Sequence, residues 1–332
     1  MFSSKRTTIE EYTKRVSKTT SFLKKYGLAI LFMAPYLISF LVFFMYPFIK
    51  GCIMSLYRYN IANVNDISWR GFLNYQKILF DSNTSYYKDF WNGMKNTLMA
   101  TAIIVPLCIL IPLGLALLIN AKPPGYKIYR AIIYLPGIFP ITATGVIFLN
   151  MFNNEYGFIN NLFKINVNWL QNPTTVWMII ILFCVWGGLG TNFVIFTAAL
   201  QNVDKSLYEA SAIDGCSKFR QRFDVTFPQI KNQMIICLFT TVCGYMNLYG
   251  QCYILGSYVQ PQNSVYTVIY VIQNQLKGTN FAVYGMTSAM AICLGVFIAL
   301  ISVAQMLITK ERKGGDKYAK QFKTFKASGE IR

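Results

Sequence analysis

The feature that most limits how this chain can fold is the separation of its charges from its long apolar runs. Six runs of at least 22 residues carry no charged side chain, and the 31 basic and 13 acidic residues all fall between or outside them. About 20 helical residues cross the ~30 Å hydrocarbon core of a bilayer. Each run therefore predicts one membrane-spanning helix. The runs are Leu28–Ile49, Asn96–Asn120, Ala131–Phe152, Val176–Leu200, Met234–Leu255 and Tyr284–Thr309.

These runs predict an all-α, polytopic membrane protein with six transmembrane helices. Hydrophobic residues make up 54% of the 332 positions, more than a soluble domain of this length normally carries. We expect a basic cytoplasmic tail at residues 1–27, a transmembrane domain at 28–309 and a second basic cytoplasmic tail at 310–332. The first 26 residues are polar and do not fit a cleavable signal peptide.

The orientation follows from the distribution of lysine and arginine. The two tails and the connectors after the second and fourth runs hold 23 of the 31 basic residues. Cytoplasmic segments are enriched in these residues. Both termini and the loop at 201–231 are therefore expected on the cytoplasmic side of the plasma membrane. The net charge of +18 indicates attraction to anionic lipid, and in so apolar a chain it does not indicate a nucleic-acid partner.

The runs lack the groups that would drive transport or catalysis. None holds an ionisable residue of the kind that marks an ion-coupled carrier, and the chain has no phosphate-binding loop and no histidine. The eight cysteines form no CxxC pair and are expected to pack as small apolar residues. We expect no catalytic residue, no metal site and no cofactor in this chain. A secondary transporter or facilitator for a neutral polar solute stays open as an alternative, and an intramembrane enzyme is strongly disfavoured.

The loop at 201–231 is more elaborate than a membrane connector requires. Ser206 and Glu209 have the spacing of a capping box, which predicts a short helix over Leu207–Asp214. Gly215 can adopt a positive φ and end that helix. The loop therefore predicts a short helix that stands off the membrane and turns at a glycine corner.

A second helix is expected after this corner. Ser217 can cap it, and Arg220 can pair with Asp224 one turn later. Pro228 is expected to end the element before the fifth run. Phenylalanines at every fourth position predict an apolar stripe that packs this helix against the bundle; they are Phe219, Phe223 and Phe227.

The loop sequence EASAIDGCSKFRQRFDVTFPQI resembles the EAA loop of ATP-binding-cassette importer permeases. Its Asp214-Gly215 pair is similar to the carbohydrate subfamily, which includes the maltose and glycerol-3-phosphate permeases. Further segments that resemble the family are NYQKILFDSNTSYYKDFWNGMKNTL, YRAIIYLPGIFP and AALQNVDKSLYEA. Two positions depart from the pattern, since Ser211 and Cys216 stand where alanine is usual.

The resemblance implies that the Leu207–Asp214 helix is a coupling helix seated in a cleft of a cytoplasmic ATPase. A purely local role for Glu209, as a cap of its own helix, stays open. The implied partners are a second related permease, two copies of the ATPase, an extracytoplasmic solute-binding protein and membrane lipid, with ATP and magnesium bound by the ATPase. The expected ATPase-coupling residues are Leu207, Glu209, Ala210, Ser211, Ile213, Asp214 and Gly215.

The fourth and fifth runs flank this loop and carry neutral polar and aromatic residues that suit a sugar or a related polyhydroxylated solute. Their glycines permit close helix approach, and the alternative role for each polar side chain is an interhelical hydrogen bond of ~0.6 kcal/mol. The candidate solute-path residues are Trp186, Gly188, Thr191, Asn192, Thr241, Tyr245, Asn247 and Gln251.

Two further segments carry structural predictions. Pro136 and Pro140 predict a kink in the third run, because each removes a backbone hydrogen bond. The connector Gly256–Val283 contains the apolar stretch VYTVIYVIQNQL, which is expected to lie on the membrane surface.

Overall fold

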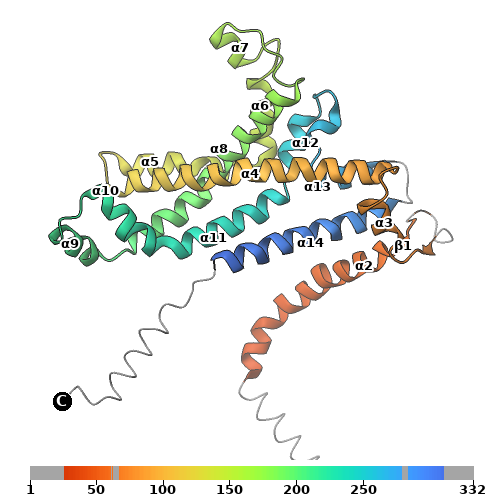
Figure 1. The fold of residues 1–332 in the computed structure, drawn as a ribbon, viewed down its shortest axis with the longest axis horizontal. Helices are drawn as coiled ribbons and strands as arrows, with labels where there is room; N and C mark the ends of the chain where they lie inside the picture. Colours follow the sequence, from red (N-terminus) through yellow and green to blue (C-terminus); the bar gives the residue numbers. More distant parts are fainter. Residues whose placement is uncertain (1–25, 61, 63–66, 279–282, 310–332) are drawn as a thin grey trace, which may run out of the picture.

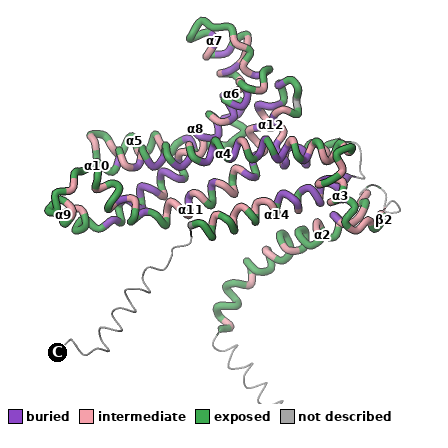
Figure 2. The backbone as a smooth tube through the Cα atoms, in the orientation of Figure 1, coloured by how far each residue is buried: buried purple, intermediate pink, exposed green. Residues whose placement is uncertain are grey.

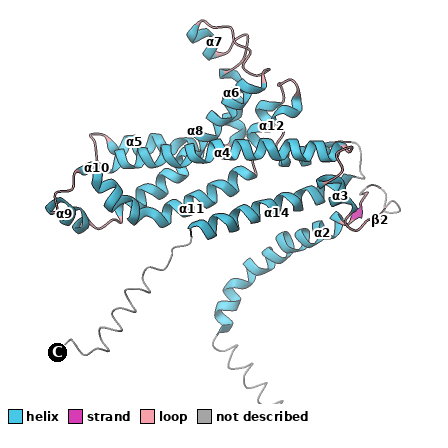
Figure 3. Ribbon diagram, viewed as in Figure 1, coloured by secondary structure: helices cyan, strands magenta, loops and turns pink. Residues whose placement is uncertain are grey.

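The computed structural model describes residues 26–309 apart from 61, 63–66 and 279–282. The described chain is almost entirely helical, and its one strand pair joins β1 (Tyr57–Arg58) to β2 (Ser68–Trp69) in antiparallel register (Figure 3). The two basic tails predicted at 1–27 and 310–332 lie outside the described residues, except for positions 26 and 27.

Four helices in the described chain are long and apolar enough to cross a membrane. They correspond to the first, second, fourth and sixth runs. The four are Tyr26–Ser55, which contains the π-helical turn η1 (Leu41–Met45) and α2 (Tyr46–Ser55), then α4 (Ser85–Asn120), α8 (Pro173–Gln201) and α14 (Tyr284–Thr309). The helices of the first and fourth runs extend beyond both predicted ends, α4 extends only at its start, and α14 has the predicted bounds.

The third run is bent, as its prolines predict. Helix α5 (Tyr126–Tyr134) continues into the 3-10 turn η3 (Leu135–Ile138), and the chain turns by 97° before α6 (Ile141–Met151). Pro136 and Pro140 flank the bend, where a proline has no N–H to extend the helix. Counting this bent pair as one span gives up to five candidate spans in the described chain.

The fifth run is divided, although its sequence predicts one continuous span over Met234–Leu255. Helix α11 (Phe227–Met246) ends at Asn247, and α12 (Gly250–Gly256) starts after a non-helical residue, Tyr249. The carbonyl of Leu248, released from the helical pattern, accepts a hydrogen bond from the Thr267 hydroxyl. A side chain from a distant segment therefore satisfies the break, so the run does not form one straight helix.

Helix α4 is the centre of the bundle (Figure 1). It packs most extensively against α8 and also contacts α11 and α13 (Val268–Lys277). Phe193 and Phe196 of α8 are fully buried in this contact region. By contrast, the Tyr26–Ser55 helix is exposed along nearly all of its length, although α2 packs against α14 (Figure 2).

The connector before α14 packs against the bundle, so the prediction that it lies on the membrane surface is wrong. Val268 and Val271 of α13 are buried against α4 and α14, because the apolar residues recur on one face of a helix that has a bundle to cover. The remaining short elements are α3 (Leu73–Leu79), α7 (Phe158–Phe163) and η5 (Gln262–Val265).

Candidate functional site

The 201–231 loop begins with α9 (Lys205–Ile213), whose N-cap is Asp204. The Asp204 carboxylate accepts a hydrogen bond from the Ser206 amide at 3.0 Å, so the capping box predicted for Ser206 and Glu209 is wrong. Asp204, two residues before Ser206, begins the helix and accepts the hydrogen bond from a free amide of its first turn. Bonds from the Ser206 amide and hydroxyl hold the pKa of Asp204 below its ordinary value of 3.8. Glu209 is exposed, and its role as a cap is excluded.

Helix α9 has two different faces. Tyr208 anchors it to the rest of the chain, because its hydroxyl hydrogen-bonds the Thr226 hydroxyl at 2.8 Å and its carbonyl accepts from Gln221. On the other face Leu207 is 38% exposed and Ile213 is 86% exposed. An apolar surface on so short a helix, outside the predicted spans, indicates a protein contact. Of the predicted coupling residues, Ser211 is half-buried and the rest are exposed.

Gly215 forms the corner after α9, as the sequence predicts. Its φ is +79°, and its amide donates to the Ala212 carbonyl at 3.1 Å. A side chain here would meet no neighbouring atom, so the requirement for glycine is conformational.

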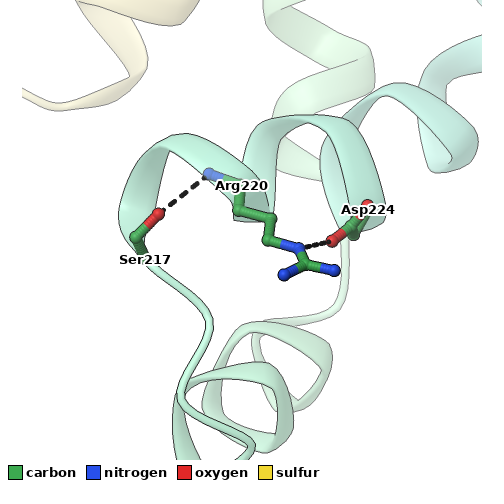
Figure 4. A network of polar contacts seen from close by, with 3 residues as sticks. All are labelled: Ser217, Arg220 and Asp224. Atoms are coloured by element: carbon green, nitrogen blue, oxygen red, sulfur yellow. Dashed lines mark hydrogen bonds and ion pairs between the residues drawn. The ribbon is translucent and has the colours of Figure 1, made fainter.

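The chain after the corner is one continuous helical path. Ser217 caps α10 (Lys218–Gln221) by accepting from the Arg220 amide, and Arg220 pairs with Asp224 at 3.0 Å (Figure 4). The path continues through the π-helical turn η4 (Arg222–Thr226) into α11. Pro228 therefore does not end the element: it lies in the first turn of α11, where its missing N–H is tolerated.

The phenylalanine stripe forms, but it does not pack as predicted. Successive ring centroids of Phe219, Phe223 and Phe227 are 5.2 Å apart. Phe219 and Phe223 are 66% and 54% exposed, and only Phe227 packs against the core. The stripe therefore reaches the core only at its C-terminal end, after the π-helical turn.

Four of the predicted path residues line one central cleft of about 230 Å³, at the bend between η3 and α6. None of the residues that line it is charged. The Trp186 ring is parallel to that of Phe139, with centroids 6.3 Å apart. The four residues that the cleft brings together are Trp186, Gly188, Tyr245 and Gln251.

The glycines of α8 permit close contacts around this cleft. A Cβ on Gly188 would lie 2.7 Å from the Tyr245 hydroxyl, which donates to the Cys184 carbonyl at 2.9 Å. A Cβ on Gly190 would lie 2.9 Å from the Tyr134 carbonyl at the bend. Gly187 has open space beside it. The glycine-rich stretch therefore lets the bent third run and α11 approach α8.

The other four predicted path residues lie elsewhere. The buried Asn192 amide donates to the Cys108 carbonyl at 2.8 Å and to the Thr241 hydroxyl at 3.1 Å, so it joins α8 to α4 and α11. Thr191 is exposed, and Asn247 is exposed with its amide bonded to the Cys243 carbonyl. Asn192 and Thr241 therefore form the interhelical hydrogen bond that was the alternative to a place on the solute path.

Two thirds of the residues that line the cleft were not predicted as path residues. Phe139 and Thr144 line it because the 97° bend turns α6 back toward α8. The signal was the proline pair, which predicts a kink but gives neither its angle nor its direction. Cys184 was expected only as packing, and it also lines the cleft.

Comparison with known proteins identifies the class. Residues 109–313 match the family described as binding-protein-dependent transport system inner membrane component. The chain belongs to this family, which comprises multi-pass membrane transport subunits of systems that use a binding protein and is not a family of catalysts.

Individual relatives cover most of the chain. The arabinooligosaccharides transport system permease protein AraP of Bacillus subtilis is 29% identical over 88% of this chain and 92% of its own length. The lactose transport system permease protein LacF of Rhizobium radiobacter is 28% identical over 85% of this chain and 94% of its own. A chain in the crystal structure of a bacterial ABC transporter that imports the acidic polysaccharide alginate aligns with a TM-score of 0.76 and 21% identity, over 89% of this chain and 99% of that one. This structural likeness concerns the fold.

Proposed function

We propose that this chain is a transmembrane permease subunit of an ATP-binding-cassette importer for a sugar or oligosaccharide. The observation that carries the proposal is that α9, with its exposed apolar face, connects α8 and α11, and both of these helices line the central cleft. A partner that moves α9 acts directly on the helices that shape the cleft.

The cleft chemistry supports a neutral polyhydroxylated solute. Gln251 and Tyr245 supply neutral polar groups, and Trp186 supplies an aromatic face. The relatives named for arabinooligosaccharides and lactose favour the same class. A polyol or a glycerol phosphate ester shares part of this chemistry, and the uptake assay below tests the sugar class itself.

Coupling requires partners that supply the energy. We assign the ATPase contact to α9 and its corner, with Leu207, Ala210 and Ile213 entering the ATPase cleft and Gly215 setting the angle. The partners are a second related permease, two ATPase copies and an extracytoplasmic binding protein. ATP and magnesium belong to the ATPase.

The topology that fits this role has six crossings. The bent pair α5 and α6 forms the third, and α11 with α12 forms a broken fifth crossing. This arrangement puts the 201–231 loop, between the fourth and fifth crossings, and both termini in the cytoplasm, in agreement with the basic residues of the loop and tails.

Uptake by the complete importer in proteoliposomes tests the proposal. Labelled arabinotriose and lactose are supplied with the binding protein, and ATP is enclosed on the ATPase side. We expect accumulation that requires ATP and is insensitive to a protonophore. Accumulation that persists without ATP and stops with the protonophore would instead establish the secondary transporter. No accumulation of either sugar would refute the sugar assignment.

A further inference from the structure

A second cavity lies away from the central cleft, lined by α6, the turn after α6, the segment before α8 and Tyr258. Figure 1 shows α6 and α7 in the lobe that projects from the bundle. The volume of the cavity, about 350 Å³, falls in the range of small-molecule sites and exceeds that of the central cleft. We call it the outer pocket. Its polar lining combines one carboxylate, that of Glu155, with four carboxamides and two tyrosine rings: Asn150, Asn153, Asn154, Gln171, Tyr156 and Tyr258.

The walls of the outer pocket are held in place by hydrogen bonds. Asn153 accepts from the amides of Glu155 and Tyr156, which fixes the turn after α6. The amide of Asn160 donates to the carbonyls of Asn154 and Val167, tying the turn to the segment before α8.

The segment that carries Tyr258 is also held in place by a hydrogen bond. The Gln260 amide donates to the Gln171 carbonyl at 3.1 Å, which holds the segment with Tyr258 against the segment before α8. Within the described chain, the buried Asn154 Oδ1 atom has no hydrogen-bond partner. This unpaired acceptor belongs to a residue of the pocket wall, and a ligand that donates hydrogen bonds can satisfy it once the Asn154 side chain turns toward the pocket.

The outer pocket and the central cleft share the same two structural elements. Ile141 and Thr144 of α6 line the cleft, and Asn150 of the same helix lines the outer pocket. Gln251 of α12 lines the cleft, and Tyr258 follows the end of α12 in the pocket. Asn150 follows Ile141 by nine helical residues, which corresponds to about 14 Å.

The outer pocket and the 201–231 loop lie at opposite ends of helix α8. Gln171 lies just before α8, and α9 follows four residues after it. The 29 residues of α8 span about 43 Å, more than the hydrocarbon core. The pocket and the 201–231 loop therefore lie on opposite sides of the membrane, and a cytoplasmic loop puts the pocket outside.

We propose that the outer pocket is an extracytoplasmic saccharide subsite. It receives one end of a neutral oligosaccharide before the sugar passes along α6 and α12 to the central cleft. Carboxamides can both donate to and accept from sugar hydroxyls, and the rings of Tyr156 and Tyr258 offer apolar faces to the sugar ring. This assignment rests on the proposed function, which supplies the solute class and the orientation.

Occupancy of the pocket is tested by thiol labelling of the complete importer in nanodiscs. A Tyr258→Cys variant is reacted with a polar maleimide, with the wild-type chain as background for the eight native cysteines. Arabinotriose at about four times its Kd should slow this labelling about fivefold. An Asn161→Cys variant, at an exposed position of α7 that does not line the pocket, should label at an unchanged rate.

A second variant tests the pocket at a residue other than the one that is labelled. Adding Asn154→Ala should raise the arabinotriose concentration needed for protection about fivefold, the effect of one lost hydrogen bond. Unchanged labelling at all arabinotriose concentrations, in an importer that takes up arabinotriose, overturns the subsite and leaves the proposed function standing. Failure of ATP-dependent uptake refutes the proposed function itself. Equal protection by sugar-free binding protein assigns the pocket to docking and overturns the subsite.

Discussion

The 201–231 loop and the central cleft carry polar and aromatic residues in opposite settings. In the loop, Leu207, Ile213 and Phe219 are exposed, and Tyr208 ties α9 to the rest of the chain. Around the cleft, the Tyr245 hydroxyl is bonded to the neighbouring helix. The loop is shaped for a surface outside this chain, whereas the cleft is built by contacts within it.

This difference between the loop and the cleft predicts different effects for substitutions in the two regions. Substitutions in the loop change a corner or an exposed face and should leave the bundle intact. Substitutions around the cleft alter contacts between α4, α8 and α11 and should change stability together with transport. Separate measurements of ATPase association, stability and uptake therefore distinguish the two regions.

The largest effect is expected from Gly215→Pro in the loop. Proline fixes φ near −65° and lacks the amide that bonds the Ala212 carbonyl, so the corner with φ of +79° cannot form. We expect normal membrane insertion, loss of ATPase co-purification and a fall in sugar uptake of more than about tenfold, since such a change costs ~3 kcal/mol or more locally.

The matched control for this change is Gly215→Asn, because asparagine tolerates the left-handed region better than other residues with a side chain. It should retain most ATPase association. Wild-type complex assembly and uptake by the proline variant would contradict the role assigned to the corner.

In the cleft, Gly188→Ala should lower stability and leave ATPase association intact, the opposite of the effect expected from Gly215→Pro. The new Cβ would lie 2.7 Å from a Tyr245 hydroxyl that is already bonded to Cys184, so α11 must move. Overpacking of this kind destabilises by about 1–3 kcal/mol. We expect a lower thermal unfolding temperature and reduced uptake, with ATPase co-purification preserved.

Gly187→Ala is the control on the same stretch of α8, since its Cβ would have no neighbouring atom within 4 Å. It should retain wild-type stability. Equal losses of stability in the two variants would show that the glycines matter for helix flexibility and not for the contact with Tyr245.

The sequence predicted the loop better than the cleft, for a physical reason. The α9 helix and the Gly215 corner depend on neighbouring residues, and the pairing of Arg220 with Asp224 is also local. The cleft depends on the angle at Pro136 and Pro140 and on the break at Asn247, which distant contacts decide. Within the loop, the exposure of Phe219 was missed because periodicity shows a stripe without showing what it faces.

A smaller effect is expected from the hydrogen bond between Asn192 and Thr241. A double-mutant cycle with Asn192→Leu and Thr241→Val should give a coupling energy of ~0.6 kcal/mol, with ~1.7 kcal/mol as the upper end for membrane helices. The measurement is the free energy of unfolding in detergent micelles. Thr191→Val, at the exposed neighbouring position, should leave stability unchanged. A loss of uptake with no coupling energy would instead place Asn192 on the solute path.

The smallest effect concerns the start of α9 and depends on pH. The hydrogen bonds from Ser206 lower the pKa of Asp204 in the folded loop, so its carboxylate stabilises α9 fully above the ordinary aspartate pKa of 3.8. This contribution is lost as the pH falls below that value through the folded-state pKa. Hydrogen exchange of the first α9 amides should therefore show a local opening that becomes more frequent below about pH 4, after correction for the intrinsic rate.

Asp204→Asn is the control for this last prediction, because asparagine keeps an N-cap acceptor and removes the titrating charge. Its α9 opening should be independent of pH across the same range, whereas Asp204→Ala should open more often at every pH. If the wild-type loop opens equally often at neutral and acidic pH, Asp204 is not the cap that holds α9. The exposed face of the loop would then be ordered by its partner and not by its own sequence.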